Sequence, residues 1–444
     1  MPRRLWNEDR WALGIVAVAT AVHAVAWGFR TAPMGDSAQY RADGLSIVGG
    51  WHHLTDRAPG YPLVLWATGS LHRETVLLFV LQAILHAGSV LLVVDVAWRL
   101  GVSRVGRAVV AGLLVVLPAM VLVRSSGSEA ISQFLVVVAV WAVVRWLDDR
   151  SSRLLVVAGA ASAAGVWVRP SMALVPLVLA VAVTVSLPAR RSGPAGAPPR
   201  RPRVRAAALV LGPAVLAFVL LVGIDAVRFD RPEASPLTGW YLSSRTSTFV
   251  DELPPRYEPG RSILVAERDR QLLLGDRYDA PNYAFSVRDD LGAALGRDRA
   301  GTDRWMLDAN LYLITHHPLE YVASIGPAVI RFTDIDSQPA VQGLGTAATW
   351  VLQIGHLLLL SAFALQAVLA PGILLSERGR PGVRRRAAGL ALCVLVVAAV
   401  AAPAVLLETG AARLRSPVDP LLALLLVAGW EIVGRAIRRP VPPT

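Results

Sequence analysis

The chain of 444 residues is 54% hydrophobic with a mean hydropathy of +0.51, and its apolar residues form blocks of bilayer length rather than short amphipathic patterns. This profile is that of a polytopic membrane protein and not of a soluble one. The net charge of +12 is the balance between 44 basic residues, all of them arginine, and 32 acidic ones. Membrane topology explains the arginine clusters better than nucleic-acid binding does.

Ten segments of the sequence are predicted to be transmembrane helices. A helix rises about 1.5 Å per residue, so about 20 apolar residues cross the hydrocarbon core of a bilayer. The segments that fit are residues 11–29, 76–98, 105–123, 130–147, 154–168, 172–187, 206–227, 347–375, 390–407 and 421–436. The fifth and sixth are short, so the "WVRPSM" stretch between them is either a tight turn between two spans or a break in one longer helix.

The arginine clusters indicate on which side of the membrane each loop lies. They occur in "MPRRLWNEDR", "WRLGVSRVGR", "VRWLDDRSSR", "PARRSGPAGAPPRRPRVR", "ERGRPGVRRR" and "RAIRRP", where ten spans with both ends inside would place cytoplasmic loops. We therefore expect a multi-pass protein of the bacterial inner (plasma) membrane with both termini cytoplasmic. The single cysteine, Cys393, lies in the ninth segment, so no disulfide forms within the chain.

This topology predicts three parts. Residues 1–227 form an N-terminal transmembrane module whose first outer loop is 30–75, residues 228–346 form a small helical domain on the outer face, and residues 347–444 supply the C-terminal spans. The amphipathic segment "HHPLEYVASIGPAVIRF" at 316–332 is predicted to lie at the membrane surface, because counting it as a span would put "ERGRPGVRRR" outside.

Charged residues gather near the outer ends of the predicted spans. Ionised groups at this depth are costly unless they are paired or face water, so charges from distant parts of the sequence suggest a shared polar cavity. The alternative is that each residue lies at the membrane–water interface without any functional role, and for any single residue this interpretation is at least as good. These residues are Asp36, Asp43, Arg57, Arg124, Glu129, Arg169, Glu408, Arg413 and Arg415.

The stretch "MGDSAQYRADG" in the first outer loop is predicted to form a short helix that begins at Asp36. Tyr40, four residues on, would share a face with Asp36. Asp36 is a suitable N-cap for the amides of Ala38 or Gln39, and spacing alone favours this structural role. A carboxylate beside a membrane cavity is also suited to accept a proton from an attacking hydroxyl. Asp43 is the weaker candidate for that role.

The next motif, "RAPGYP" at residues 57–62, places two prolines and a glycine before an apolar helix. These residues turn and stiffen the chain, which is typical of a loop that re-enters the membrane surface. Arg57 favours a functional interpretation as well, because a guanidinium offers a fork of donors matched to phosphate oxygens.

In their order, these motifs resemble the membrane glycosyltransferases of the GT-C superfamily, particularly the polyprenyl-phosphate-sugar branch with protein O-mannosyltransferases and aminoarabinose transferases. "GDSAQY" and "RAPGYP" follow the first span, and "SSGSEAI" lies at the outer start of a later one. "WVRPSMALVP" resembles the Arg-Pro element of the family, and "HHPLEYVASIGPAVIRF" its His-Pro helix. "ETGAARLRSPVDPLLALLL" resembles the pattern before the last span. The likeness extends over nearly the whole chain.

The resemblance implies an all-α polytopic membrane protein, a GT-C-like bundle of about ten transmembrane helices with an outer-face loop domain. It implies that Asp36 is the catalytic residue, with Arg57 and Tyr61 near the donor phosphate and the late arginines on the lipid phosphate. The implied substrate-binding residues are Tyr40, Arg57, Tyr61, Glu129, Arg169, Glu408, Arg413 and Arg415. Ser37 stands where protein mannosyltransferases carry a second acid, which makes a role in cell-envelope glycans or lipids comparably plausible.

The implied reaction transfers a hexose or pentose from a polyprenyl-phosphate donor to a hydroxyl of a cell-envelope glycan, lipid or protein on the outer face. A single displacement would invert the anomeric centre. The expected partners are the donor, the acceptor and membrane lipids, with no nucleic acid. The main alternative is a polytopic transporter or lipid flippase. Two features of the sequence disfavour it: the spans are poor in polar residues at their centres, and the two halves of the chain do not repeat. The retained charged residues disfavour an inactive scaffold.

No cofactor is predicted and no metal ion is required by the sequence. Asp36 and Glu129 are in principle able to share a divalent cation, but no stretch has dense metal-ligand spacing. The histidine pairs at 52–53 and 316–317 suit polar interface residues better than metal ligands. Whether His316 and His317 contact substrate is left open by the sequence.

Overall fold

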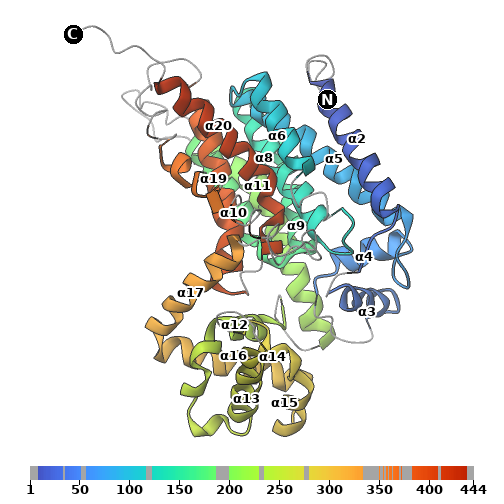
Figure 1. Cartoon of the computed structure of the whole chain (residues 1–444), viewed down its shortest axis with the longest axis vertical. Coiled ribbons are helices and arrows are strands. Elements are labelled where there is room, and N and C mark those ends of the chain that lie inside the picture. Colours follow the sequence, from blue (N-terminus) through green and yellow to red (C-terminus); the bar gives the residue numbers. More distant parts are fainter. Residues whose placement is uncertain are drawn as a thin grey trace, which may run out of the picture. The chain divides into compact units, whose positions relative to one another are not determined.

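The computed structural model is almost entirely helical (Figure 1). It describes residues 9–33, 36–51, 57–116, 123–186, 200–229, 235–274, 280–333, 350, parts of 354–372, 383–408 and 412–437. Within these residues the only extended pairing is an isolated parallel bridge between Ala32 and Ser125. The predicted all-α class is therefore confirmed.

The chain divides into two compact units, which we call the bundle and the second unit. The bundle comprises Met1–Pro232, Gln338–Val400 and Ser416–Thr444, and the second unit comprises Glu233–Ser337 and Ala401–Arg415. Helix α19 (Val383–Leu406) begins in the bundle and ends in the second unit.

The bundle contains the helices that were predicted as spans. Its helices are α2 (Arg10–Trp27), α3 (Ser37–Val48), α4 (Gly60–Ala67), α5 (Val76–Arg99), α6 (Arg104–Val116), α8 (Glu129–Asp149), α9 (Ser152–Val168), α10 (Leu174–Ser186), α11 (Arg200–Phe229) and α20 (Asp419–Ile437), with most of α19. Nine of the ten predicted segments fall on helices, whereas residues 347–375 are described only in part. Among the described helices, α5, α8, α11, α19 and α20 are long and apolar enough to cross a membrane.

The bundle is held by aliphatic side chains and by close backbone approach. Helix α8 packs against α5 and α9, α11 runs along α9, and α20 packs on α6. The core consists mainly of valine, leucine and alanine. Gly159 of α9 faces the backbone carbonyl of Leu209 in α11, so any side chain there would collide with the neighbouring helix. Small residues at such crossings allow membrane helices to pack tightly.

The "WVRPSM" stretch breaks the chain between α9 and α10. Helix α9 ends at Val168, Arg169 is extended with φ −148° and ψ 107°, and a 3-10 turn follows at Pro170–Ala173. The residue before a proline is pushed out of the helical region, and a proline is well suited to begin the next helical turn. The two predicted spans are therefore separate helices, and Arg169 lies in the break between them.

Ion pairs hold the end of the bundle that lies opposite the starts of α5 and α8. Arg99 near the end of α5 donates to Asp95 at 2.9 Å and to Asp148 of α8 at 2.8 Å. Arg107 of α6 pairs with the buried Asp9 at 3.0 Å. Buried charges that are paired in this way do not require water or a ligand.

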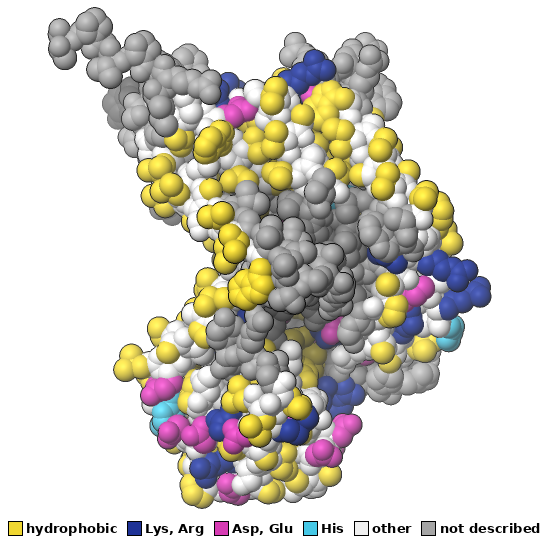
Figure 2. All heavy atoms as spheres, in the orientation of Figure 1, with side chains coloured by type: hydrophobic (Ala, Val, Ile, Leu, Met, Phe, Trp, Pro, Cys, Tyr) yellow, Lys and Arg dark blue, Asp and Glu magenta, His cyan; other side chains and the backbone are white. Residues whose placement is uncertain are grey.

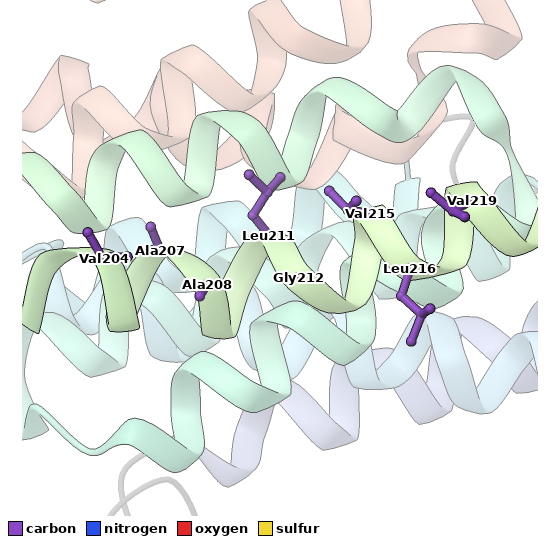
Figure 3. Close-up of a pocket in the computed structure, with 8 residues that line it drawn as sticks. All are labelled: Val204, Ala207, Ala208, Leu211, Gly212, Val215, Leu216 and Val219. Carbon is purple, nitrogen blue, oxygen red and sulfur yellow. The ribbon is translucent and has the colours of Figure 1, made fainter. Parts of the chain in front are cut away.

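Hydrophobic side chains cover much of the visible bundle surface (Figure 2). An apolar groove of about 600 Å³ runs along α11 from Val204 to Val219 (Figure 3). Exposed apolar side chains are expected where lipid tails cover a helix. The groove offers no polar group from its lining side chains, so it suits hydrocarbon and does not suit a sugar.

The second unit is a set of shorter helices with a core of its own. It contains α12 (Thr238–Thr246), α13 (Gly260–Leu273), α14 (Tyr283–Ser286), α15 (Arg288–Leu295), α16 (Arg299–His316) and α17 (Pro318–Thr333). Trp240, Tyr283 and Met306 are fully buried in its core. Helix α17 has 16 residues, buries Ala328 and Phe332, and exposes Leu319. It is amphipathic as predicted and shorter than a typical span.

Candidate active site

The carboxylate of Asp36 lies at the start of α3, as predicted, but it does not cap that helix. Asp36 has φ −88° and ψ −5°, and its side chain makes no capping bond to the first turn. Its Oδ1 instead lies 3.1 Å from Nη2 of Arg57. An N-cap residue normally has an extended backbone that aims its oxygen at the first-turn amides. The predicted cap bond is therefore wrong, because Asp36 is itself helical.

Arg57 is held by three groups that lie between residues 36 and 43. Besides the Asp36 carboxylate, Asp43 Oδ2 accepts a bond from the Arg57 backbone N–H at 3.0 Å, and the guanidinium lies 5.5 Å from the centre of the Tyr40 ring. The side chains of Asp36 and Arg57 keep exposed fractions of 24% and 18%. A ligand is thus able to reach this ion pair without unfolding the loop.

Tyr40 connects the parts of the site from a buried position. Its ring packs edge to face on Tyr61, with the ring centres 4.8 Å apart, and its hydroxyl lies 3.2 Å from Ser128 Oγ. Burial raises the pKa of the Tyr40 hydroxyl, against the opposing positive charges of Arg57 and Arg169. The Tyr40 hydroxyl therefore stays neutral, and its ring supports Arg57.

The start of α4 packs directly on the end of α9. A Cβ on Gly60 would lie 2.6 Å from the carbonyl oxygen of Trp167, so only glycine fits there. The next residue, Tyr61, is fully buried, and its hydroxyl has no hydrogen-bond partner among the described residues. Burial, with the negative charge of Glu129, raises the Tyr61 pKa well above its usual value. The "RAPGYP" and "WVRPSM" motifs are therefore in contact.

Glu129 and Arg169 form a second, more buried ion pair. Glu129 begins α8, and its Oε1 lies 3.7 Å from Nη2 of Arg169. The side chains have exposed fractions of 4% and 13%. Glu129 Oε2 has no hydrogen-bond partner within the described part of the chain. A buried carboxylate with one free oxygen is able to accept a bond from a ligand hydroxyl.

The loop before α8 joins the two ion pairs. Ser126 N–H donates to the carbonyl of Ala32 at 2.9 Å, and the hydroxyl of Ser37 donates to the Ser126 carbonyl at 2.8 Å. With the contact between Tyr40 and Ser128, these bonds fasten α3 to the residues that lead into Glu129. The structure thus brings together Asp36, Tyr40, Arg57, Tyr61, Glu129 and Arg169.

Two further carboxylates of this region hold the site together. Asp43, the weaker candidate for the base in the sequence, fastens the backbone of Arg57. Glu74, which the sequence did not single out, precedes α5 and accepts bonds from Thr31, Arg41 and Ser126. Glu74 stands in no motif with a recognisable spacing, so only the folded chain shows its contacts.

A few polar side chains also lie inside two of the predicted spans, which are otherwise apolar. Gln82 and His86 of α5 and Gln133 of α8 are all buried. Gln82 donates to the Ser125 carbonyl at 3.2 Å, and Gln133 Nε2 lies 3.1 Å from His86 Nδ1. These groups bond within the protein, and Gln82 contacts the loop that leads into Glu129.

The late charged residues belong to the second unit. Arg415 lies in a 3-10 turn at Ala412–Val418, is 2% exposed, and donates to the Phe332 carbonyl at 2.7 Å. Glu408 follows α19 in the same unit, and the side chain of Arg413 lies outside the described residues. His316 stacks on Tyr312 with ring centres 3.9 Å apart.

No group of three or more histidine, cysteine or acidic side chains that could hold a metal ion occurs among the described residues. The expectation that no metal ion is required stays a prediction, as does the possibility that Asp36 and Glu129 share a divalent cation. Both carboxylates are instead paired with arginines.

Part of the chain that carries this site matches a known protein family. Residues 56–193 match the family described as dolichyl-phosphate-mannose-protein mannosyltransferase. The fold is similar to that of the Archaeoglobus fulgidus oligosaccharyltransferase in the apo form, with a TM-score of 0.51 and 13% identity over 98% of this chain and 52% of that one. The resemblance to the GT-C membrane glycosyltransferases is confirmed.

Two further structures align over nearly the whole chain. The A. fulgidus oligosaccharyltransferase AglB with an inhibitory peptide and a dolichol-phosphate has a TM-score of 0.47 and 14% identity over 99% of this chain and 53% of that one. ArnT from Cupriavidus metallidurans bound to undecaprenyl phosphate has a TM-score of 0.39 and 16% identity over 96% and 78%. This chain spans about half the length of the oligosaccharyltransferases. No curated protein sequence matches it.

The match to this family covers part of the site. Arg57, Tyr61, Glu129 and Arg169 fall within residues 56–193, whereas Asp36 precedes them. The contact between Asp36 and Arg57 therefore connects a matched segment to one outside the match.

Proposed function

We propose that the protein transfers a sugar from a polyprenyl-phosphate donor to a hydroxyl of an acceptor on the outer face of the membrane. The observation that carries this proposal is the partly exposed Asp36–Arg57 pair. This pair places a proton acceptor and a phosphate-binding group close enough to contact the same donor and acceptor molecules. The match of residues 56–193 to a family named for a lipid-phosphate sugar donor supports it.

The reaction needs little covalent chemistry from the protein. The acceptor oxygen forms a bond to the anomeric carbon while the bond from that carbon to the donor phosphate breaks. The hydroxyl proton passes to the Asp36 carboxylate, and the lipid phosphate leaves with the bonding electrons. Guanidinium groups stabilise the charge that grows on this phosphate. One displacement of this kind inverts the anomeric centre.

The ion pair couples donor binding to activation of the acceptor. Without donor, Arg57 occupies the Asp36 carboxylate, and a paired carboxylate accepts a proton less readily. A donor phosphate offers Arg57 a competing anion, because the guanidinium fork matches phosphate oxygens. The carboxylate is then released toward the acceptor hydroxyl. Asp43 and Tyr40 keep the Arg57 segment in place during this exchange.

The buried part of the site is suited to the sugar. Glu129 Oε2 and the Tyr61 hydroxyl are buried polar atoms that have no partner among the described residues. Such atoms cost free energy unless they are bonded, and sugar hydroxyls supply both donors and acceptors. Arg169 offers a second cation next to Glu129. The acceptor class stays broad and includes glycans, lipids and proteins. We propose no required metal or cofactor.

A transfer assay with purified protein in detergent tests this function. Labelled sugar is followed from a polyprenyl-phosphate donor to product, with wild type, Asp36→Asn and Arg57→Ala. Loss of a general base lowers kcat by about 10² to 10⁴ fold, so kcat of Asp36→Asn should fall in this range. The donor KM should not rise, because asparagine no longer competes with the donor phosphate for Arg57. Arg57→Ala should lower kcat and also raise the donor KM. Product formation that persists in EDTA would support a reaction without metal.

Asp149→Asn is the matched control. Asp149 pairs with Arg145 at 2.9 Å at the other end of α8 and is 44% exposed. This variant should keep wild-type activity. Full activity in Asp36→Asn would remove the proposed base. Passage of intact lipid or sugar across sealed vesicles, without a glycosidic product, would show a transporter or flippase instead.

Cysteine labelling tests the outer-face location. In a Cys393→Ser background, Ala38→Cys should react with a membrane-impermeant reagent from outside the cell. Ser152→Cys should react only after the cytoplasmic side is opened. Ala38 and Ser152 are both exposed, so neither result depends on burial. The opposite pattern would place the site in the cytoplasm.

A further inference from the structure

Glu74 gathers three donors from three separate segments of the bundle. Its Oε1 accepts from the guanidinium of Arg41 on α3. Its Oε2 accepts from the hydroxyl of Thr31, which follows α2, and from the hydroxyl of Ser126, which precedes α8. The Glu74 side chain is only 16% exposed. A carboxylate is the side chain that accepts several such bonds at once.

The segment that carries Glu74 is itself firmly held. Thr75 caps α5 by accepting a bond from the Leu78 N–H at 3.3 Å. The Thr75 hydroxyl donates to the Thr68 carbonyl at 3.0 Å and lies 2.6 Å from Ser70 Oγ. Glu74 is thus a fixed point between the end of α4 and the start of α5.

The three donors surround the segment with Asp36. Thr31 lies five residues before Asp36, and Arg41 lies five residues after it. Ser126 belongs to the loop that leads into Glu129, and its carbonyl accepts from Ser37. We propose that Glu74 is a positioning residue for sugar transfer: it locks α3, and with it the Asp36 carboxylate, against the loop that leads into Glu129.

The lock depends on the charge of Glu74 as well as on its shape. Glutamine has the same length but carries one oxygen and no charge, so Arg41 would lose its anion. Hydrogen bonds between ionised groups are stronger than those between neutral groups. In a network, breaking several bonds at once costs more free energy than the sum of the separate pairs. Without these bonds, α3 keeps its own helical bonds and the contacts of Ser37 and Tyr40 with the loop. It loses the charged connection that runs from Arg41 through Glu74 to Ser126.

This inference rests on the proposed transfer function. A displacement of about 1 Å at a reacting group is able to cost about 10² fold in rate. Glu74 touches neither donor nor acceptor in this scheme. Its loss should therefore lower kcat at least about tenfold and leave the KM for the polyprenyl-phosphate donor within about twofold.

The test compares Glu74→Gln, Arg41→Met and the double variant with wild type. Two experiments are carried out in detergent. The first measures kcat and KM for transfer from the polyprenyl-phosphate sugar, and the second measures amide hydrogen exchange of peptides covering Ser37–Val48. Each single variant should lower kcat and speed α3 exchange. The double variant should be no worse than Glu74→Gln, because both changes break the same bond.

Glu431→Gln is the matched control. Glu431 of α20 is 19% exposed and accepts from Ser103 N–H at 2.9 Å and from the Ser103 hydroxyl at 2.5 Å. It also pairs with Arg435 at 3.7 Å. It resembles Glu74 in burial and in accepting from three donor groups, although these belong to two residues, and it lies away from α3. This variant should change neither kcat nor α3 exchange.

Each outcome decides the proposal. Slower turnover with faster α3 exchange supports it. Wild-type exchange in Glu74→Gln overturns it, as does faster exchange with unchanged kcat. Additive losses in the double variant would also overturn it. If wild type transfers no sugar from any polyprenyl-phosphate donor, the proposed function fails, while α3 exchange still decides whether Glu74 holds this helix.

Discussion

Replacing Gly60 by alanine should push apart the two motifs that meet at the site. A Cβ at this position would lie 2.6 Å from the carbonyl oxygen of Trp167, 2.7 Å from its carbonyl carbon and 2.9 Å from the backbone nitrogen of Val168. Ordinary carbon contacts lie at about 3.5 Å. The neighbours are all backbone atoms, so no side-chain rotation relieves the contact. The start of α4 must therefore move by about 0.5 to 1 Å.

The size of the effect follows from two opposing terms. Alanine favours a helix over glycine by about 0.5 to 1 kcal/mol, and Gly60 is the first residue of α4. Overpacking a tight contact costs about 1 to 3 kcal/mol. The variant should thus be less stable by about 1 to 2 kcal/mol. Since Arg57 and Arg169 flank this contact, transfer should fall by about 10² fold.

Thermal unfolding in detergent and the transfer assay measure both effects. Gly112→Ala is the control, since Gly112 lies within α6 with no atom near the position of an added Cβ. It should be neutral or slightly stabilising and fully active. If Gly60→Ala were as stable and as active as wild type, the contact between the two motifs would not be what holds the site.

Three further predictions concern buried or paired groups. Tyr61→Phe should raise stability by about 1 kcal/mol, because it removes an unbonded buried hydroxyl, yet lower kcat/KM for transfer about tenfold. Arg169→Ala should destabilise by about 3 kcal/mol because it leaves the Glu129 carboxylate buried and unpaired, whereas Glu129→Gln should cost less. Hydrogen bonds from Arg270 and other groups lower the pKa of Glu267 to about 2. Its contribution to stability is therefore present above about pH 4.5 and is lost as the pH falls toward 2.

The measurements for these variants separate stability from function. Unfolding midpoints and kcat/KM are recorded for Tyr61→Phe, and a loss of stability would show that its hydroxyl is bonded within the fold. Equal destabilisation by Arg169→Ala and Glu129→Gln would contradict the view that the carboxylate is the costly partner. Glu267→Gln should show a weaker loss of stability than wild type between pH 5 and pH 2, and parallel curves would refute the assignment.

Much of the bundle is predictable from the sequence. The lengths of α5, α8, α11 and α19 follow from long apolar stretches, since a bilayer imposes a minimum length that no local detail overrides. The break at Arg169 was visible as an Arg-Pro step, although the sequence left two interpretations open. The order of the motifs also predicted that Asp36, Arg57 and Glu129 belong to one region.

The contacts within that region were less predictable. Helix spacing assigned Asp36 to a cap bond, and the structure pairs it with Arg57. The preference for Asp at an N-cap describes carboxylates whose only hydrogen-bond donors are the amides of the first helical turn. Here the guanidinium of Arg57, in the next motif, binds the carboxylate more strongly than those amides do. The polar residues within α5 and α8 were overlooked because Gln82 and His86 are isolated in an otherwise apolar run.

The sequence by itself determined the membrane class, most of the spans and the motifs that surround the site, because hydrocarbon thickness and proline chemistry act through short stretches of chain. Only the tertiary structure decided which charges meet. Glu74 reaches Thr31, Arg41 and Ser126 across 43, 33 and 52 residues of sequence. Pairings at such separations depend on helix packing, which places these side chains together without leaving any local pattern around them.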